Sequence, residues 1–198
     1  MGAANSLSVP AFAPFWRRWY RSAGGFLDLP EAGTLCGVTR LSRNVNEYLE
    51  GGQLDLDDRA AVVHDVLSLP MLSDDLYECA RAGVQLFTLH VLFPIARTAT
   101  IRRRLLPVMR KAQSRLKGSL KGQELIVWSC LVAAIAADVE GFESAWFIGH
   151  LGGLLRHRRV GSLSQLKESL SRFAWVDRVC DEPAIGVLRA CMGNFDAS

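Results

Sequence analysis

This sequence has no long apolar run and almost no net charge. Its apolar stretch over residues 125–137 is shorter than the ~20 residues that cross a bilayer, so we expect no transmembrane helix. The 23 basic and 20 acidic residues give a net charge of +3, which does not by itself indicate a nucleic-acid-binding protein. Hydrophobic residues make up 49% and charged residues 22%, values that exclude a disordered chain and are typical of a globular one.

The chain also lacks the residue spacings that form disulfide frameworks and zinc sites. No two cysteines are separated by two residues, and no two histidines have the four-residue helical spacing of a zinc protease. The odd number of cysteines and the absence of a charged, apolar, cleavable start favour reduced, buried thiols in a protein that is not secreted. The five cysteines are Cys36, Cys79, Cys130, Cys180 and Cys191.

No segment shows the alternation of apolar and polar residues that is typical of a strand, whereas apolar residues recur every three or four positions along most of the chain. We therefore predict an all-α protein: a single compact multi-helix domain of about eight or nine helices over 31–198, preceded by an N-terminal segment, 1–30. The glycine and acidic residues predict that one helix ends at Gly51-Gly52 and that a long helix begins at Asp74-Asp75. The prolines predict that this long helix kinks or ends at Pro94, that a basic helix is interrupted at Pro107 and that the last helix begins near Asp181-Glu182-Pro183.

The N-terminal segment allows a membrane-attached alternative. The first residues fit the loose pattern for N-myristoylation, in which Gly2 is acylated. Behind it, aromatic residues share one face of a predicted helix, with arginines opposite, as in an interfacial helix. The alternative function is therefore a helical adaptor attached peripherally to a membrane. The aromatic residues are Phe12, Phe15, Trp16, Trp19 and Tyr20.

A catalytic arrangement of nucleophile, base and orienting group is not visible. We predict no catalytic, cofactor-binding or metal-binding residues, and we expect the protein not to be an enzyme. Gly149, Gly152 and Gly153 lack the context of a phosphate-binding loop, so we expect them to let two helices approach closely. A small-molecule effector held between helices near Gly149, Gly152 and His150 is a further alternative.

The charge distribution has one pronounced feature. The nine basic residues from Arg97 to Lys121 are accompanied by no acidic residue, and because the whole chain is +3, this +9 segment leaves −6 for the remainder. Such a segment can be a solvated helix face or a surface that docks an acidic partner, whereas nucleic-acid contact would need interleaved aromatic residues. The predicted docking surface comprises Arg102, Arg103, Arg104, Arg110, Lys111, Arg115, Lys117 and Lys121.

Several apolar and aromatic segments follow one another in a fixed order between Gln123 and about Leu188. They are Glu124 to Trp128, Ala133 to Ala137, Ala145 to Ile148 with Leu151, Ser164 to Lys167 with Leu170, Phe173-Ala174-Trp175 and Cys180-Asp181. In these segments the chain resembles the C-terminal part of the regulatory domain of fungal zinc-cluster transcription factors. In that family, a helix with an early tryptophan is followed by a Trp-Phe helix, a Trp motif and a closing Cys-Asp.

The resemblance implies a stand-alone regulatory domain that acts through protein or effector contacts, with transcription factors or co-regulators as partners and a nuclear or nucleocytoplasmic location. The six-cysteine DNA-binding module of the family has no counterpart in this chain, so we do not expect sequence-specific DNA binding. The resemblance is carried by apolar packing residues. Trp128, Trp146 and Trp175 are therefore predicted to be core anchors between helices.

Overall fold

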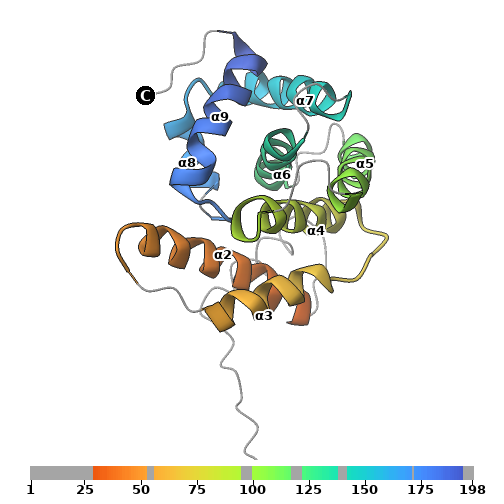
Figure 1. Ribbon diagram of the computed structural model, residues 1–198. Helices are drawn as coiled ribbons and strands as arrows, with labels where there is room; N and C mark the ends of the chain where they lie inside the picture. The colour runs from red at the N-terminus through yellow and green to blue at the C-terminus, as the bar shows by residue number, and fades with distance from the viewer. Residues whose placement is uncertain are drawn as a thin grey trace, which may run out of the picture.

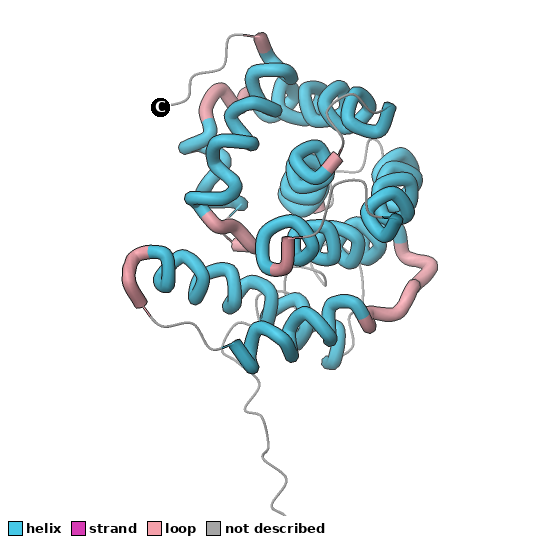
Figure 2. Tube along the Cα trace, viewed as in Figure 1, coloured by secondary structure: helices cyan, strands magenta, loops and turns pink. Residues whose placement is uncertain are grey.

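The computed structural model describes residues 29–52, 56–94, 100–116, 122–137, 142–170 and 172–193. The predicted N-terminal helix and its acylation site lie outside these ranges. The described residues confirm the all-α prediction, because they form eight α-helices and one π-helical segment, with no strand among them (Figures 1 and 2). The elements are α2 (Leu29–Leu49), α3 (Leu56–Leu67), α4 (Asp75–Phe87), η1 (Thr88–Leu92), α5 (Thr100–Arg115), α6 (Gln123–Ala136), α7 (Phe142–Arg158), α8 (Leu163–Leu170) and α9 (Asp177–Met192).

Helix α6 is the centre of the molecule. It carries the most apolar sequence of the chain, and every residue from Leu125 to Ala137 is buried. In Figure 1 α6 is seen nearly end-on, with α4, α5, α7 and α9 arranged around it. Helices α2 and α3 pack together beyond α4 and form a second layer. This arrangement explains why α6 shows no polar face, since a helix surrounded on all sides has no solvent to meet.

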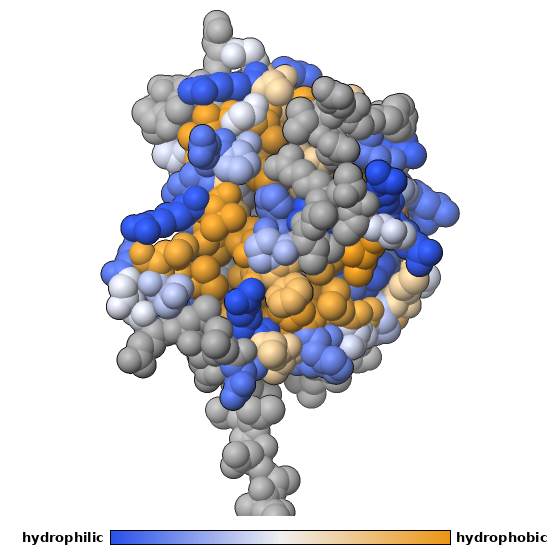
Figure 3. Space-filling view, in the orientation of Figure 1, coloured by the Kyte–Doolittle hydropathy of each residue, from blue (hydrophilic) through white to orange (hydrophobic). Residues whose placement is uncertain are grey.

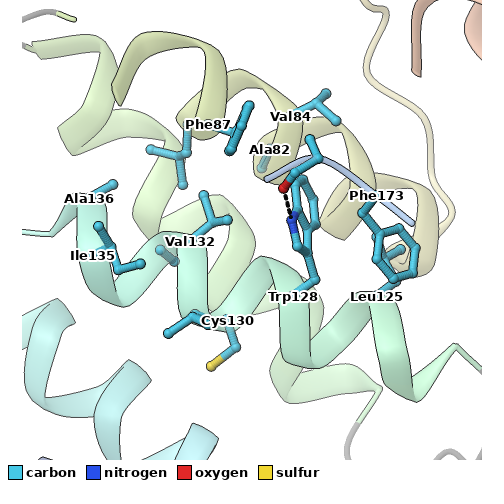
Figure 4. Close-up of a cluster of buried hydrophobic side chains, with 14 of the residues drawn as sticks. Ala82, Val84, Phe87, Leu125, Trp128, Cys130, Val132, Ile135, Ala136 and Phe173 are labelled. Carbon is cyan, nitrogen blue, oxygen red and sulfur yellow. Dashed lines mark hydrogen bonds between the residues drawn. The ribbon is translucent and has the colours of Figure 1, made fainter. Parts of the chain in front are cut away.

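The core is organised around Trp128, whose side chain is fully buried. Its indole Nε1 donates a hydrogen bond of 2.8 Å to the carbonyl of Ala174 (Figure 4). Phe173 stacks on the indole at a centroid distance of 5.7 Å, and Phe87 of α4 contacts it at 6.3 Å. Gly83 makes room for the ring, because a Cβ at that position would lie 2.6 Å from Trp128 Cζ3. Trp128 thus joins α4, α6 and the segment before α9.

The predicted helix ends are partly confirmed. Helix α2 ends before Gly51, whose φ of 103° is the left-handed conformation that glycine favours. Asp74 caps α4, since its side chain accepts a hydrogen bond of 2.6 Å from the amide of Tyr77. The long helix ends just before Pro94 as predicted, although its last turn, η1, is π-helical rather than α-helical.

Two predictions that relied on proline were wrong. Helix α5 continues through Pro107 without interruption. Pro107 lies on the exposed side of the helix, where water can bind the carbonyl that a proline leaves without a donor. The last helix begins at Asp177, four residues before the predicted start at Asp181, and Pro183 lies inside it.

A buried polar network crosses from α4 to the end of α3. Glu78 and Arg81 are 7% and 6% exposed and form a bidentate pair, with Arg81 Nη2 2.6 Å from Glu78 Oε2. Arg81 Nη1 also donates to Gln85 Oε1 at 3.0 Å, and Gln85 Nε2 donates to the carbonyl of Val66 at 3.1 Å. Each buried charge is therefore satisfied within α4, and the network fixes α3 against α4.

Candidate functional site: the cationic face of α5 and the groove beside α7

Helix α5 exposes one side along its whole length, and the predicted basic residues divide according to their place around it. Arg103, Arg104 and Lys111 are exposed and form no ion pair with another described residue. They point away from the buried stripe of Leu105, Met109 and their helical neighbours. We call these three residues the cationic face of α5. The hydrophilic side chains at the right of Figure 3 lie over this helix.

The two flanks of this exposed side are held by ion pairs to neighbouring helices. Arg110 Nε lies 3.2 Å from Glu143 Oε2 of α7, and Arg115 Nη1 lies 3.1 Å from Asp75 Oδ1 of α4. Both pairs are only partly exposed, and pairs that water still reaches contribute about 0–1 kcal/mol of stability. The two ion pairs connect α5 to α7 and to α4 and so help to fix its orientation. Arg103, Arg104 and Lys111 stay exposed on the side of α5 between these pairs.

Arg102 is not part of this surface, which corrects its predicted role. It is 1% exposed and faces the interior, where its Nη2 donates to the carbonyl of Leu89 at 2.6 Å and its Nη1 lies 3.3 Å from His90 Nδ1. The helical spacing carries this information, because Arg102 precedes the buried Leu105 and Leu106 by three and four positions. Lys117 and Lys121 lie outside the described residues.

A groove with a volume of about 530 Å³ runs between α5 and α7. Gly149 and His150, two of the residues that we predicted near an effector site, line this groove. The third, Gly152, faces α9 instead, and a Cβ there would lie 2.9 Å from the carbonyl of Cys191. The complete lining is Ser114 of α5 with Ala145, Trp146, Gly149, His150 and Gly153 of α7.

The three glycines of α7 therefore have different roles. Gly152 allows α7 and α9 to approach closely, as predicted. Gly149 and Gly153 do not, because a Cβ on either would meet no atom within 4 Å. Glycine inside a helix costs about 1 kcal/mol relative to alanine, so these two positions keep the groove open at some cost in stability.

Trp146 differs from the predicted core anchor. Its side chain is half-buried and borders the groove, where it stacks on His150 at a centroid distance of 4.8 Å. Its other contact is an edge-to-face arrangement with the buried Phe147 at 5.0 Å. Trp128 and Trp175 are buried as predicted, at 0% and 3% exposure. Of the three tryptophans, Trp146 is the one that offers an aromatic surface to a ligand or partner.

The segments that carry the family resemblance meet around the start of α9. Trp175 Nε1 donates to Asp181 Oδ1 at 2.8 Å, and Lys167 Nζ lies 2.7 Å from Asp181 Oδ2. Burial lowers the pKa of Lys167, but the hydrogen bonds to Asp181 and Asp177 outweigh it and raise the pKa above its ordinary value. Asn46 of α2 bonds the carbonyl of Trp175 and the amide of Asp177, at 2.9 and 3.0 Å.

The buried thiols belong to the packed interior of the molecule. Cys79, Cys130 and Cys180 are buried as predicted, whereas Cys191 is only half-buried, contrary to the prediction. Burial raises the pKa of each of these four thiols, that of Cys180 to about 12 and that of Cys191 to about 11. His64 is largely exposed beside Asp65. Within the described ranges, no group of three His, Cys, Asp or Glu side chains is placed to hold a metal ion.

In the part of the chain that the structure describes, no helix has the length and apolar character to cross a membrane. No protein-family model matches this sequence, and no significant similarity to a curated protein or to a solved structure is found. The chemistry of the site must therefore be interpreted from its own residues. It offers exposed cations, an aromatic surface and an open groove, which are features of a binding surface.

Proposed function

We propose that this chain is a helical regulatory domain of the kind found in fungal zinc-cluster transcription factors, and that it acts by binding protein partners through the cationic face of α5. One observation carries this proposal. Four of the segments that resemble the family are joined in three dimensions, by Trp128 bonding to Ala174 and by Lys167 and Trp175 bonding to Asp181.

The location of the binding surface follows from charge. Arg103, Arg104 and Lys111 lie exposed on a helix that ion pairs hold in place, in the segment that carries +9 while the rest of the chain carries −6. Such a surface attracts an acidic protein and accelerates its association. The absence of interleaved aromatic residues on α5 favours a protein partner over a nucleic acid.

A reporter assay tests the proposal. The chain is fused to a heterologous zinc-cluster DNA-binding module in a fungal cell, and expression of a reporter with the matching site is measured. We expect the fusion to change reporter expression relative to the DNA-binding module alone. We expect Arg103→Glu with Lys111→Glu to remove that change.

The matched control is Arg178→Glu with Arg189→Glu, which alters the net charge equally at exposed positions of α9. This variant is expected to keep the regulatory effect. Reporter expression equal to that of the DNA-binding module alone, from a fusion present at normal level, would contradict the regulatory function. Equal loss of effect in both charge variants would contradict the assignment to α5.

A further inference from the structure

The groove between α5 and α7 has the shape of a trough between two helices. Ala145, Gly149 and Gly153 recur every four residues on α7, so the wall that they form carries no bulky side chain. The space above Gly149 and Gly153 is open, because a Cβ on either would meet no atom within 4 Å. A wall of such small residues lets another helix approach at the 8–10 Å axial distance of ordinary helix packing.

The groove has an apolar surface at its base. Trp146 is half-buried and stacked on His150, so part of the indole is available to an inserted side chain. Its contact with the buried Phe147 fixes the ring against the core. An aliphatic side chain placed over Gly149 would therefore contact a rigid aromatic surface, which is the environment of a typical interface anchor.

Ser114 is the residue of α5 that lines the groove, and the side of α5 that carries Ser114 is cationic along its length. Arg103 and Arg110 precede Ser114 by eleven and four residues, so all three share one side of the helix, and Lys111 lies beside them. Arg110 is engaged with Glu143, whereas Arg103 and Lys111 are exposed without an ion pair to any described residue. This side of α5 therefore complements acidic groups at two positions separated by about two turns, next to the groove.

We propose that this groove binds an acidic amphipathic helix of a protein partner. An aliphatic side chain of that helix packs over Gly149 and Gly153 against Trp146, and its acidic side chains pair with Arg103 and Lys111. The inference deepens the proposed function and rests on it: it gives the partner's chemistry and the mode of recognition, a helix in a groove.

The test uses the full chain and a fluorescein-labelled synthetic peptide with leucine at helical spacing and glutamate and alanine elsewhere. Binding is measured by fluorescence polarisation. We expect saturable binding that Gly149→Leu with Gly153→Leu weakens by about tenfold or more, because the new side chains occupy the trough. A peptide with lysine in place of glutamate is expected not to bind.

Gly186→Leu is the matched control, since Gly186 of α9 is also a helical glycine with no atom within 4 Å of an added Cβ. It should leave the affinity unchanged, and circular dichroism should show that all variants are folded. Affinity that survives groove filling but is lost with Arg103→Glu and Lys111→Glu would overturn the groove and leave the cationic face as the binding surface. Absence of binding by the acidic peptide would overturn the inference, while the reporter assay would still decide the proposed function.

Discussion

At the scale of single residues, Gly83 shows how the core limits the sequence. The indole of Trp128 occupies the space where a side chain at position 83 would lie. A methyl group there must therefore displace the indole or separate α4 from α6. We predict that Gly83→Ala lowers the free energy of unfolding by about 1–3 kcal/mol, the usual cost of overpacking, despite the gain in helix propensity. Gly186→Ala, at an open position, should raise it by up to about 1 kcal/mol. Urea unfolding followed by circular dichroism measures both, and equal effects would contradict the packing around Trp128.

The buried thiols predict a loss of stability at alkaline pH. Burial raises the pKa of Cys180 from 9.0 to about 12. Above pH 9 the unfolded chain therefore releases this proton while the folded chain retains it. The contribution of Cys180 to the free energy of unfolding is thus constant below pH 9 and falls between pH 9 and 12. The contribution of one such thiol is about 1.4 kcal/mol per pH unit.

Urea unfolding at pH 8 and pH 10 measures this effect, with Cys180→Ala as the comparison. The variant is expected to lose less stability between the two pH values than the unaltered chain does. An identical pH dependence in both proteins would show that Cys180 titrates normally in the folded state.

At the scale of helices, α5 combines an exposed arginine and a buried one within three positions. Arg102 donates to the carbonyl of Leu89 in η1, whereas Arg104 is exposed. We predict that Arg102→Met lowers the free energy of unfolding by about 1–3 kcal/mol, since the Leu89 carbonyl loses its charged donor in the interior. Arg104→Met should change it by less than about 0.5 kcal/mol. Thermal unfolding of the two variants measures the difference, and equal stabilities would contradict the placement of Arg102.

The helices themselves were predictable because their apolar spacing and caps are local signals. Gly51 ends α2 and Asp74 caps α4 as their residue types indicate. The predicted helix boundaries were wrong where the tertiary surroundings of a residue, and not its type, decide whether the helix continues. Pro107 is tolerated because it faces solvent, and the early start of α9 depends on Asp181 being used by Trp175 and Lys167 rather than as a cap.

The candidate site was predictable only in part for the same reason. The charge of the segment around α5 is visible in the sequence, and so is the position of Arg102 on the same side of the helix as Leu105 and Leu106. The partner of Arg102, the Leu89 carbonyl, depends on how α5 packs against η1. Trp146 is half-buried because of how α5 and α7 are arranged around it, and this arrangement cannot be predicted from a local sequence pattern. The buried pair of Glu78 and Arg81 was missed because charged residues three positions apart usually indicate an exposed helix face.

At the scale of the whole molecule, α6 holds the surrounding helices in place and the binding features gather on one side. The cationic face of α5, the groove and Trp146 are all built by α5 and α7, which pack on α6. Helices α2 and α3, in the second layer beyond α4, contribute no residue to this groove. The central proposal therefore concerns location: we propose that partners bind where α5 and α7 meet.

Hydrogen–deuterium exchange of the full chain, with and without the acidic amphipathic peptide, tests this claim most directly. Binding to a groove between two helices slows exchange of the backbone amides that it covers and stabilises. We predict increased protection of Thr100–Arg115 and Phe142–Arg158, with unchanged exchange in α2 and α3. Protection confined to α2, α3 or α9 would contradict the account and place the binding surface on another side of the molecule.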